Sequence, residues 1–173
     1  MNAMECLLER RSIRKYKAEQ IKEEELDAVL KAATYAPTAK GTQSPLIVSV
    51  QDPEDIAVMK KLNAQINGTE NVDTFYGAPT VVVVFAEKGN PNGMQDASLV
   101  LGNMMNAAYA EGLGSCWINR ARQTFELPEG KALMNKWGIG ENWEGVGNCI
   151  LGYPDCELPV PKARKEGYIV KIR

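Results

Sequence analysis

The chain contains no histidine among its 173 residues, and this absence excludes several kinds of active site. A Ser-His-Asp triad, a Cys-His dyad and a zinc or haem centre held by histidine all require an imidazole. The cysteines do not replace it, because no two of them have the Cys-x-x-Cys spacing of metal and iron–sulfur sites. We therefore predict no metal site and no catalytic side chain. The thiols are expected to be buried: Cys6, Cys116, Cys149 and Cys156.

Long apolar runs and strong net charge are also missing. The longest apolar run, 81–86, is far shorter than the roughly 18 residues of a membrane span, and Glu5 and Glu9 stand where a signal peptide would be apolar. The net charge of -2 argues against general nucleic-acid binding. With 45% hydrophobic residues, the sequence predicts one globular domain over 1–173. We expect a cytoplasmic protein with no membrane or nucleic-acid partner.

Two common nucleotide-binding signatures are absent. Residues 138–140 and 145–147 each read Gly-x-Gly, but neither continues to the third glycine of a Rossmann fingerprint, and no Gly-x-x-x-x-Gly-Lys-Ser/Thr loop occurs. A nucleotide, if the protein uses one, must be held in another way.

What the sequence does contain is an uneven distribution of positive charge. Five basic residues lie between positions 10 and 17, and five between 162 and 173. Guanidinium groups form paired, charge-assisted hydrogen bonds with phosphate oxygens, so the two clusters could converge on one phosphate. A basic run is more often a solvated surface, and spacing alone leaves both interpretations open.

Apolar periodicity predicts the secondary structure. We expect helices over about 4–11, 23–35, 53–66, 96–111 and 128–137, and strands over 46–50, 80–86, 115–118, 145–151 and 168–172. This order indicates an α/β or α+β sandwich of helices around one sheet. The run 80–86 is typical of a strand buried on both faces. The helix over 96–111 is apolar around most of its circumference, which predicts a large core or a second subunit beside it.

Several short segments, taken together and in order, resemble the nitroreductase family of FMN-dependent oxidoreductases. They are Arg10-Arg11-Ser12-Ile-Arg14, Ala36-Pro37-Thr38-Ala39, Tyr76-Gly77-Ala78-Pro79, Asn103-Met104-Met105, Gly114-Ser115-Cys116-Trp117-Ile118, Gly152-Tyr153-Pro154 and Lys162-Ala-Arg164-Lys165. The resemblance covers nearly the whole chain. It implies an α+β fold with a mixed sheet between helices, assembled as an intertwined homodimer with FMN at the subunit interface.

The resemblance also implies cofactor-binding residues. Arg10, Arg11, Ser12, Arg14, Lys162 and Arg164 would contact the FMN phosphate and ribityl chain. Pro37, Thr38, Ala39 and Gln43 would belong to a loop that the partner subunit lays against the isoalloxazine, with Asn71 at its pyrimidine edge. Backbone amides around Trp117, Ile118 and Asn119 would lie beside flavin N5 and O4. The loop departs from the family pattern at Gly41 and at Ser44.

The implied activity is ping-pong hydride transfer from NADH or NADPH, through the flavin, to a small-molecule oxidant such as a nitroaromatic or quinone. The cofactor carries out the covalent chemistry, which agrees with a chain that lacks histidine. One alternative of another class stays open. A protein of the same fold could bind FMN as a flavin store, a sensor or a flavin-fragmenting enzyme, without turning over a nicotinamide.

Overall fold

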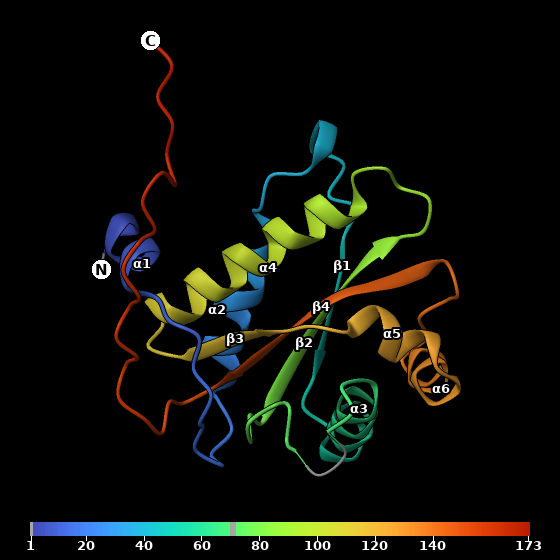
Figure 1. The fold of residues 1–173 in the computed structure, drawn as a ribbon. Coiled ribbons are helices and arrows are strands. Elements are labelled where there is room, and N and C mark those ends of the chain that lie inside the picture. The colour runs from blue at the N-terminus through green and yellow to red at the C-terminus, as the bar shows by residue number, and fades with distance from the viewer. Residues whose placement is uncertain (1, 70–71) are drawn as a thin grey trace.

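A computed structural model describes residues 2–69 and 72–173 (Figure 1). A four-stranded sheet lies at its centre, in the order β1-β2-β4-β3. The strands are β1 (Leu46–Val50), β2 (Thr80–Glu87), β3 (Gly114–Ile118) and β4 (Trp143–Gly152). The expected α+β class is confirmed, but the three strand pairings are all antiparallel instead of mixed. A parallel pairing occurs in an isolated bridge between Ser12 and Ser115.

Helices cover both faces of this sheet, as Figure 1 shows. On one face lie α2 (Glu23–Thr34) and α4 (Gly93–Ala110), and on the other α3 (Pro53–Ile66), α5 (Ala121–Glu126) and α6 (Pro128–Lys136). The short α1 (Ala3–Glu9) lies at the carboxyl end of α4, and a 3₁₀ turn, η1 (Ala39–Gly41), lies at the amino end of α4. None of the described helices has the length and apolar character that crossing a membrane requires.

The alternation of β2 explains why the sheet has a core on each face. Val81, Val83 and Phe85 pack towards α3, α5 and α6, whereas the intervening Val82, Val84 and Ala86 pack towards α2 and α4. All six side chains are at most 2% exposed. Successive side chains of a strand point to opposite faces, so a continuous apolar run is what a central strand with two covered faces needs. The predicted central position of 80–86 is therefore confirmed.

Local sequence signals account for the helix ends. Asp52 caps α3 by accepting from the backbone amides of Glu54 and Asp55, and Pro53 occupies its first position. A capping box between Asn2 and Glu5 begins α1. Gly112, with φ of 76°, follows α4. The sequence did not predict α5, which is only six residues long.

Two expectations about the carboxyl-terminal region are wrong. Residues 168–172 form no strand, and Cys156 is exposed instead of buried, on a tail that is exposed throughout from 155 to 173. Figure 1 shows this tail passing α1 and extending beyond the rest of the molecule. A β-prone sequence forms a strand only where another strand offers hydrogen bonds, and no described strand pairs with residues 168–172. Cys156 lies on this segment and is exposed, whereas the other three cysteines are buried.

Candidate functional site

The first basic cluster lies against the free edge of β3. Arg10 follows α1, and its backbone amide donates to the carbonyl of Cys6 in the last turn of that helix. The chain then runs beside β3, where the amide of Ile13 donates to the carbonyl of Ser115 at 3.0 Å and Ser12 forms its bridge. Ile13 itself is buried at 3% exposure and fixes the segment in the core. Arg10, Arg11 and Ser12 are thus held at one end of this strand, and Arg14 is exposed just beyond them.

The two guanidinium groups of this segment carry buried donors that have no acceptor among the described residues. They are Nη1 of Arg10 and Nε of Arg11. Nη1 of Arg11 donates to the carbonyls of Leu8 and Arg10, both at 2.8 Å, which fixes the orientation of its guanidinium. A buried polar group without a partner costs free energy, and an anion is the ligand that would satisfy both donors. The segment Arg10–Arg14, which we call the arginine segment, therefore fits a phosphate group.

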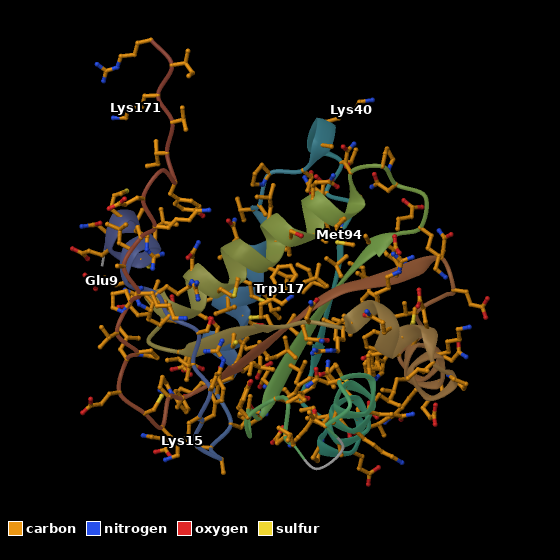
Figure 2. The ribbon with its side chains drawn as sticks, viewed as in Figure 1. Glu9, Lys15, Lys40, Met94, Trp117 and Lys171 are labelled. Carbon is orange, nitrogen blue, oxygen red and sulfur yellow. The ribbon has the colours of Figure 1, made fainter. Side chains whose placement is uncertain are left out.

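The same edge of β3 continues past the arginine segment. Because the carbonyl of Ser115 faces Ile13, the backbone amide of Trp117, two residues further along, faces the same edge. Two residues of a strand span about 7 Å. The Trp117 ring packs on Gly147, where a Cβ would lie only 2.8 Å from two ring carbons, and Figure 2 shows the ring on the side of the sheet that faces α4.

The next two predicted residues can contribute to this edge in different ways. Ile118 is only 7% exposed, so its side chain belongs to the core and its backbone alone is available to a ligand. Asn119 is exposed. The structure thus brings the arginine segment and the Trp117–Asn119 segment onto one edge of one strand.

The loop carrying Pro37, Thr38, Ala39 and Gln43 is fixed by short hydrogen bonds. The Ala39 amide donates to Oδ1 of Asp96 at 3.0 Å, and the Gln43 amide donates to the Thr38 hydroxyl at 2.9 Å. Gln43 has a φ of 52°, a left-handed conformation that is uncommon outside glycine. Part of the loop lines an open groove of about 640 Å³: Thr34, Tyr35, Ala36, Pro37, Thr38, Gly41 and Gln43.

This loop and the arginine segment lie at opposite ends of α4. Asp96 holds the loop near the start of the helix, whereas the Cys6 thiol of α1 bonds to the carbonyl of Asn106 near its end. Ten helical residues separate these two contacts, which is about 15 Å along the axis. In Figure 2, Lys40 and Glu9 lie beyond opposite ends of α4. Within one chain, the two parts of the predicted site therefore do not meet.

The remaining predicted residues are not joined to either part. Lys162 and Arg164 are exposed in the tail, where the Arg164 guanidinium donates to the carbonyl of Lys162. No described hydrogen bond or ion pair connects these two side chains to the first cluster. Asn71 lies outside the described residues.

Two titratable groups near the arginine segment, the Tyr16 phenol and the Cys149 thiol, are held neutral. Burial raises the pKa of the Tyr16 phenol, whose hydroxyl donates to the carbonyl of Ile13 at 2.8 Å. Burial also raises the pKa of the Cys149 thiol on β4, although the positive charge of Arg10 acts in the opposite direction. A buried neutral thiol is a poor nucleophile. Neither group therefore adds a charge beside the arginines.

Sequence reasoning missed Asp96, which anchors the loop. It is 4% exposed, and its Oδ2 has no partner among the described residues. In the sequence it looks like an ordinary acidic residue in the first turn of a helix, where it interacts with the dipole. Only the fold shows that its carboxylate reaches a loop 57 residues earlier in the chain.

Comparison with known proteins gives concordant results. The sequence matches the Nitroreductase family over residues 7–153. A relative from Archaeoglobus fulgidus, provisionally named an NADH dehydrogenase/NAD(P)H nitroreductase, is 33% identical over 88% of this chain and 87% of its own length. A Thermus thermophilus NADH dehydrogenase is 36% identical over 87% of this chain and 67% of its own. The crystal structure of a Bacteroides fragilis nitroreductase with bound FMN superposes with a TM-score of 0.88 at 29% identity, covering 100% of both chains.

Proposed function

Because the chain belongs to the nitroreductase family, we propose that it is an FMN-dependent oxidoreductase that uses NADH or NADPH to reduce a nitroaromatic, quinone or similar acceptor. The observation that carries this proposal is the arginine segment on the edge of β3, with two buried guanidinium N–H groups that lack acceptors. Bound FMN would supply the chemistry of hydride transfer at its N5 atom.

The protein's part is to bind and orient. Arg10, Arg11, Ser12 and Arg14 hold the phosphate and ribityl chain, and Lys162 and Arg164 join them when the tail folds against this end of the molecule. The segment Trp117-Ile118-Asn119 lies along the same edge, and the backbone amides of Trp117 and Asn119 would be its donors to the isoalloxazine. We assign no side chain as a proton relay, because solvent can deliver protons.

A second copy of the chain completes the site as a homodimer. A twofold axis across α4 would pack two copies of this helix antiparallel, so the start of each helix, with the loop 37–43, would meet the end of the other, with the arginine segment. The outer surface of α4 suits this contact, since Met94 and Leu99 are 46% and 47% exposed. The partner's loop would then supply Pro37, Thr38, Ala39 and Gln43.

The exposed tail supports the same assembly. It carries six large apolar side chains that are exposed, at 47% to 90%: Leu158, Val160, Tyr168, Ile169, Val170 and Ile172. The expected strand over 168–172 can form if a second copy offers a strand edge, because edge strands pair readily with another chain. We also propose that residues 1–173 act as one domain in the cytoplasm, with a small-molecule oxidant as the partner and without nucleic acid or membrane.

Anaerobic reduction tests the activity. Purified protein loaded with FMN should lose its yellow colour when NADH or NADPH is added, and regain it on addition of a nitroaromatic or a quinone. Steady-state rates at several fixed acceptor concentrations should give parallel double-reciprocal lines, as expected when the two substrates use one face of the flavin in turn. Flavin that binds but is not bleached by either nicotinamide would favour a flavin store, sensor or flavin-fragmenting enzyme instead.

A further inference from the structure

We propose that three asparagines, Asn63, Asn67 and Asn148, are positioning residues that aim two backbone N–H groups at the bound flavin. The N–H groups belong to Asn119 and Arg120, directly after β3. This inference rests on the proposed function, because it assigns a role at the same flavin site. We refer to the three residues as the asparagine clamp.

Each member of the clamp holds one of three consecutive residues. The Asn148 side-chain amide donates to the carbonyl of Ile118 at 3.1 Å. The Asn63 side-chain amide donates to the carbonyl of Asn119 at 2.7 Å. The Arg120 guanidinium donates to the Asn67 side-chain oxygen.

The clamp comes from two elements on different sides of the held segment. Asn63 and Asn67 are four residues apart, so they share one face of α3, and Asn67 caps the end of that helix. Asn148 lies on β4, paired in register with Ile118. Residues 118–120 are therefore fixed from the neighbouring strand and from the helix beneath it.

Fixing these carbonyls also fixes the amides that follow them. A trans peptide group is planar, and its N–H points opposite to its C=O; no described peptide bond is cis. Because the Ile118 carbonyl is held towards β4, the Asn119 N–H points away from β4, to the edge that carries the arginine segment. Because the Asn119 carbonyl is held towards α3, the Arg120 N–H points away from α3. Neither amide has a described acceptor within the protein.

Two features indicate that this arrangement is more than packing. Arg120 has a φ of 74°, a left-handed conformation that is strained for a residue with a side chain and that tends to mark functional sites. Asn63 and Asn148 are 0% and 1% exposed, and the Oδ1 atom of each has no partner among the described residues. An apolar side chain of similar shape would avoid that cost. The presence of asparagine at both positions therefore indicates that the hydrogen bonds donated by the two side-chain amides have a role.

The aimed amides would act on the flavin through electrostatics. Donors fixed before the reaction stabilise negative charge that develops beside them, and they do so strongly where water is excluded. Amides facing the N5 and O4 edge of the ring would favour the reduced cofactor over the oxidised one. The clamp would therefore set the reduction potential of bound FMN, while the arginine segment sets its affinity.

The test compares three clamp variants with a matched control. Asn63→Leu and Asn148→Leu remove a buried donor at nearly constant shape, and Asn67→Ala removes the contact between Arg120 and an exposed side chain. The control is Thr80→Val, because Thr80 is 0% exposed and its hydroxyl bonds to Gln20 and Gln51 away from β3. Each protein is loaded with FMN, and its flavin affinity, reduction potential and melting temperature are measured.

In each buried clamp variant, we expect the affinity for reduced FMN, divided by the affinity for oxidised FMN, to fall about tenfold from its wild-type value. This change lowers the two-electron reduction potential of the bound FMN by about 30 mV. Asn67→Ala should shift the potential in the same direction by a smaller amount. Affinity for oxidised FMN should change less than threefold, because the phosphate contacts remain. Thr80→Val should lower the melting temperature and leave the potential unchanged.

Amide hydrogen exchange gives an independent measurement. In the wild type, FMN should slow exchange at Asn119 and Arg120, and 5-deaza-FMN, which lacks the N5 acceptor, should protect them less. The clamp variants should lose this protection. If all three variants keep the wild-type potential and protection, the inference is overturned, and Asn67→Ala decides the matter should the buried variants not fold. A wild-type protein that binds no FMN would overturn the proposed function itself.

Discussion

Arg10→Met should change the stability of the protein and its affinity for FMN in opposite directions. Without FMN, Nη1 of Arg10 is buried with no acceptor among the described residues, and such a group costs about 1–3 kcal/mol. Methionine keeps much of the apolar stem and removes the unsatisfied donor. The free energy of unfolding of the apoprotein should therefore stay constant or rise by up to about 2 kcal/mol.

FMN binding should weaken in the same variant. Loss of one charge-assisted phosphate contact costs about 1.5–3 kcal/mol, equivalent to about 10- to 150-fold in Kd. At an FMN concentration of a hundred times the wild-type Kd, the ligand stabilises the wild type by about 2.7 kcal/mol, and a variant with 30-fold weaker binding by about 0.9 kcal/mol.

Two measurements on each protein decide the outcome. Urea unfolding of the apoprotein gives its stability, and titration of FMN followed by flavin fluorescence gives the Kd. Arg122→Met is the matched control, because Arg122 is exposed and pairs with Glu126 and Glu144 on the surface. The control should leave the FMN Kd unchanged. The reasoning is refuted if Arg10→Met binds FMN as tightly as the wild type, or if its apoprotein is destabilised by more than about 1.5 kcal/mol.

Two further predictions follow from the stabilising contacts and from the tail. Hydrogen bonds from Lys136 and Trp137 lower the pKa of Asp55 below its ordinary value of 3.8. The charged carboxylate therefore stabilises the fold at pH values above 3.8. This stabilisation is lost as the pH falls through the lower pKa that Asp55 has in the folded protein. Urea unfolding should show Asp55→Asn losing less stability than the wild type between pH 5 and pH 2, and equal losses would contradict the assignment. Light scattering on the full chain should give a mass of about twice 19.0 kDa. A chain that ends at Asp155 should dissociate into monomers at a higher protein concentration than the full chain and should bind FMN more weakly. A truncated chain that dimerises like the full one would show that the tail is not part of the interface.

The features that could be predicted from the sequence are those that depend on local chemistry. Thr80–Ala86 reads as a strand buried on both faces because every side chain in it is compatible with an apolar environment, and it is one of the two central strands. Asp52-Pro53 predicts the start of α3 because a carboxylate cap and a fixed φ need no distant partner. The position of the arginine segment after a short helix follows from periodicity in the same way.

Contacts between residues that are distant in the sequence could not be predicted in this way and are seen only in the folded chain. At the edge of β3, Ser12 and Ile13 pair with Ser115, about a hundred positions away in the chain, and no local pattern predicts such a pairing. Nothing in the sequence distinguishes Asp96, Asn63 and Asn148 from other polar residues. Their roles come from burial beside specific backbone carbonyls and amides. The expected strand over 168–172 is wrong for the same reason. The β propensity of a segment is local, whereas the partner strand that it requires is distant in the sequence.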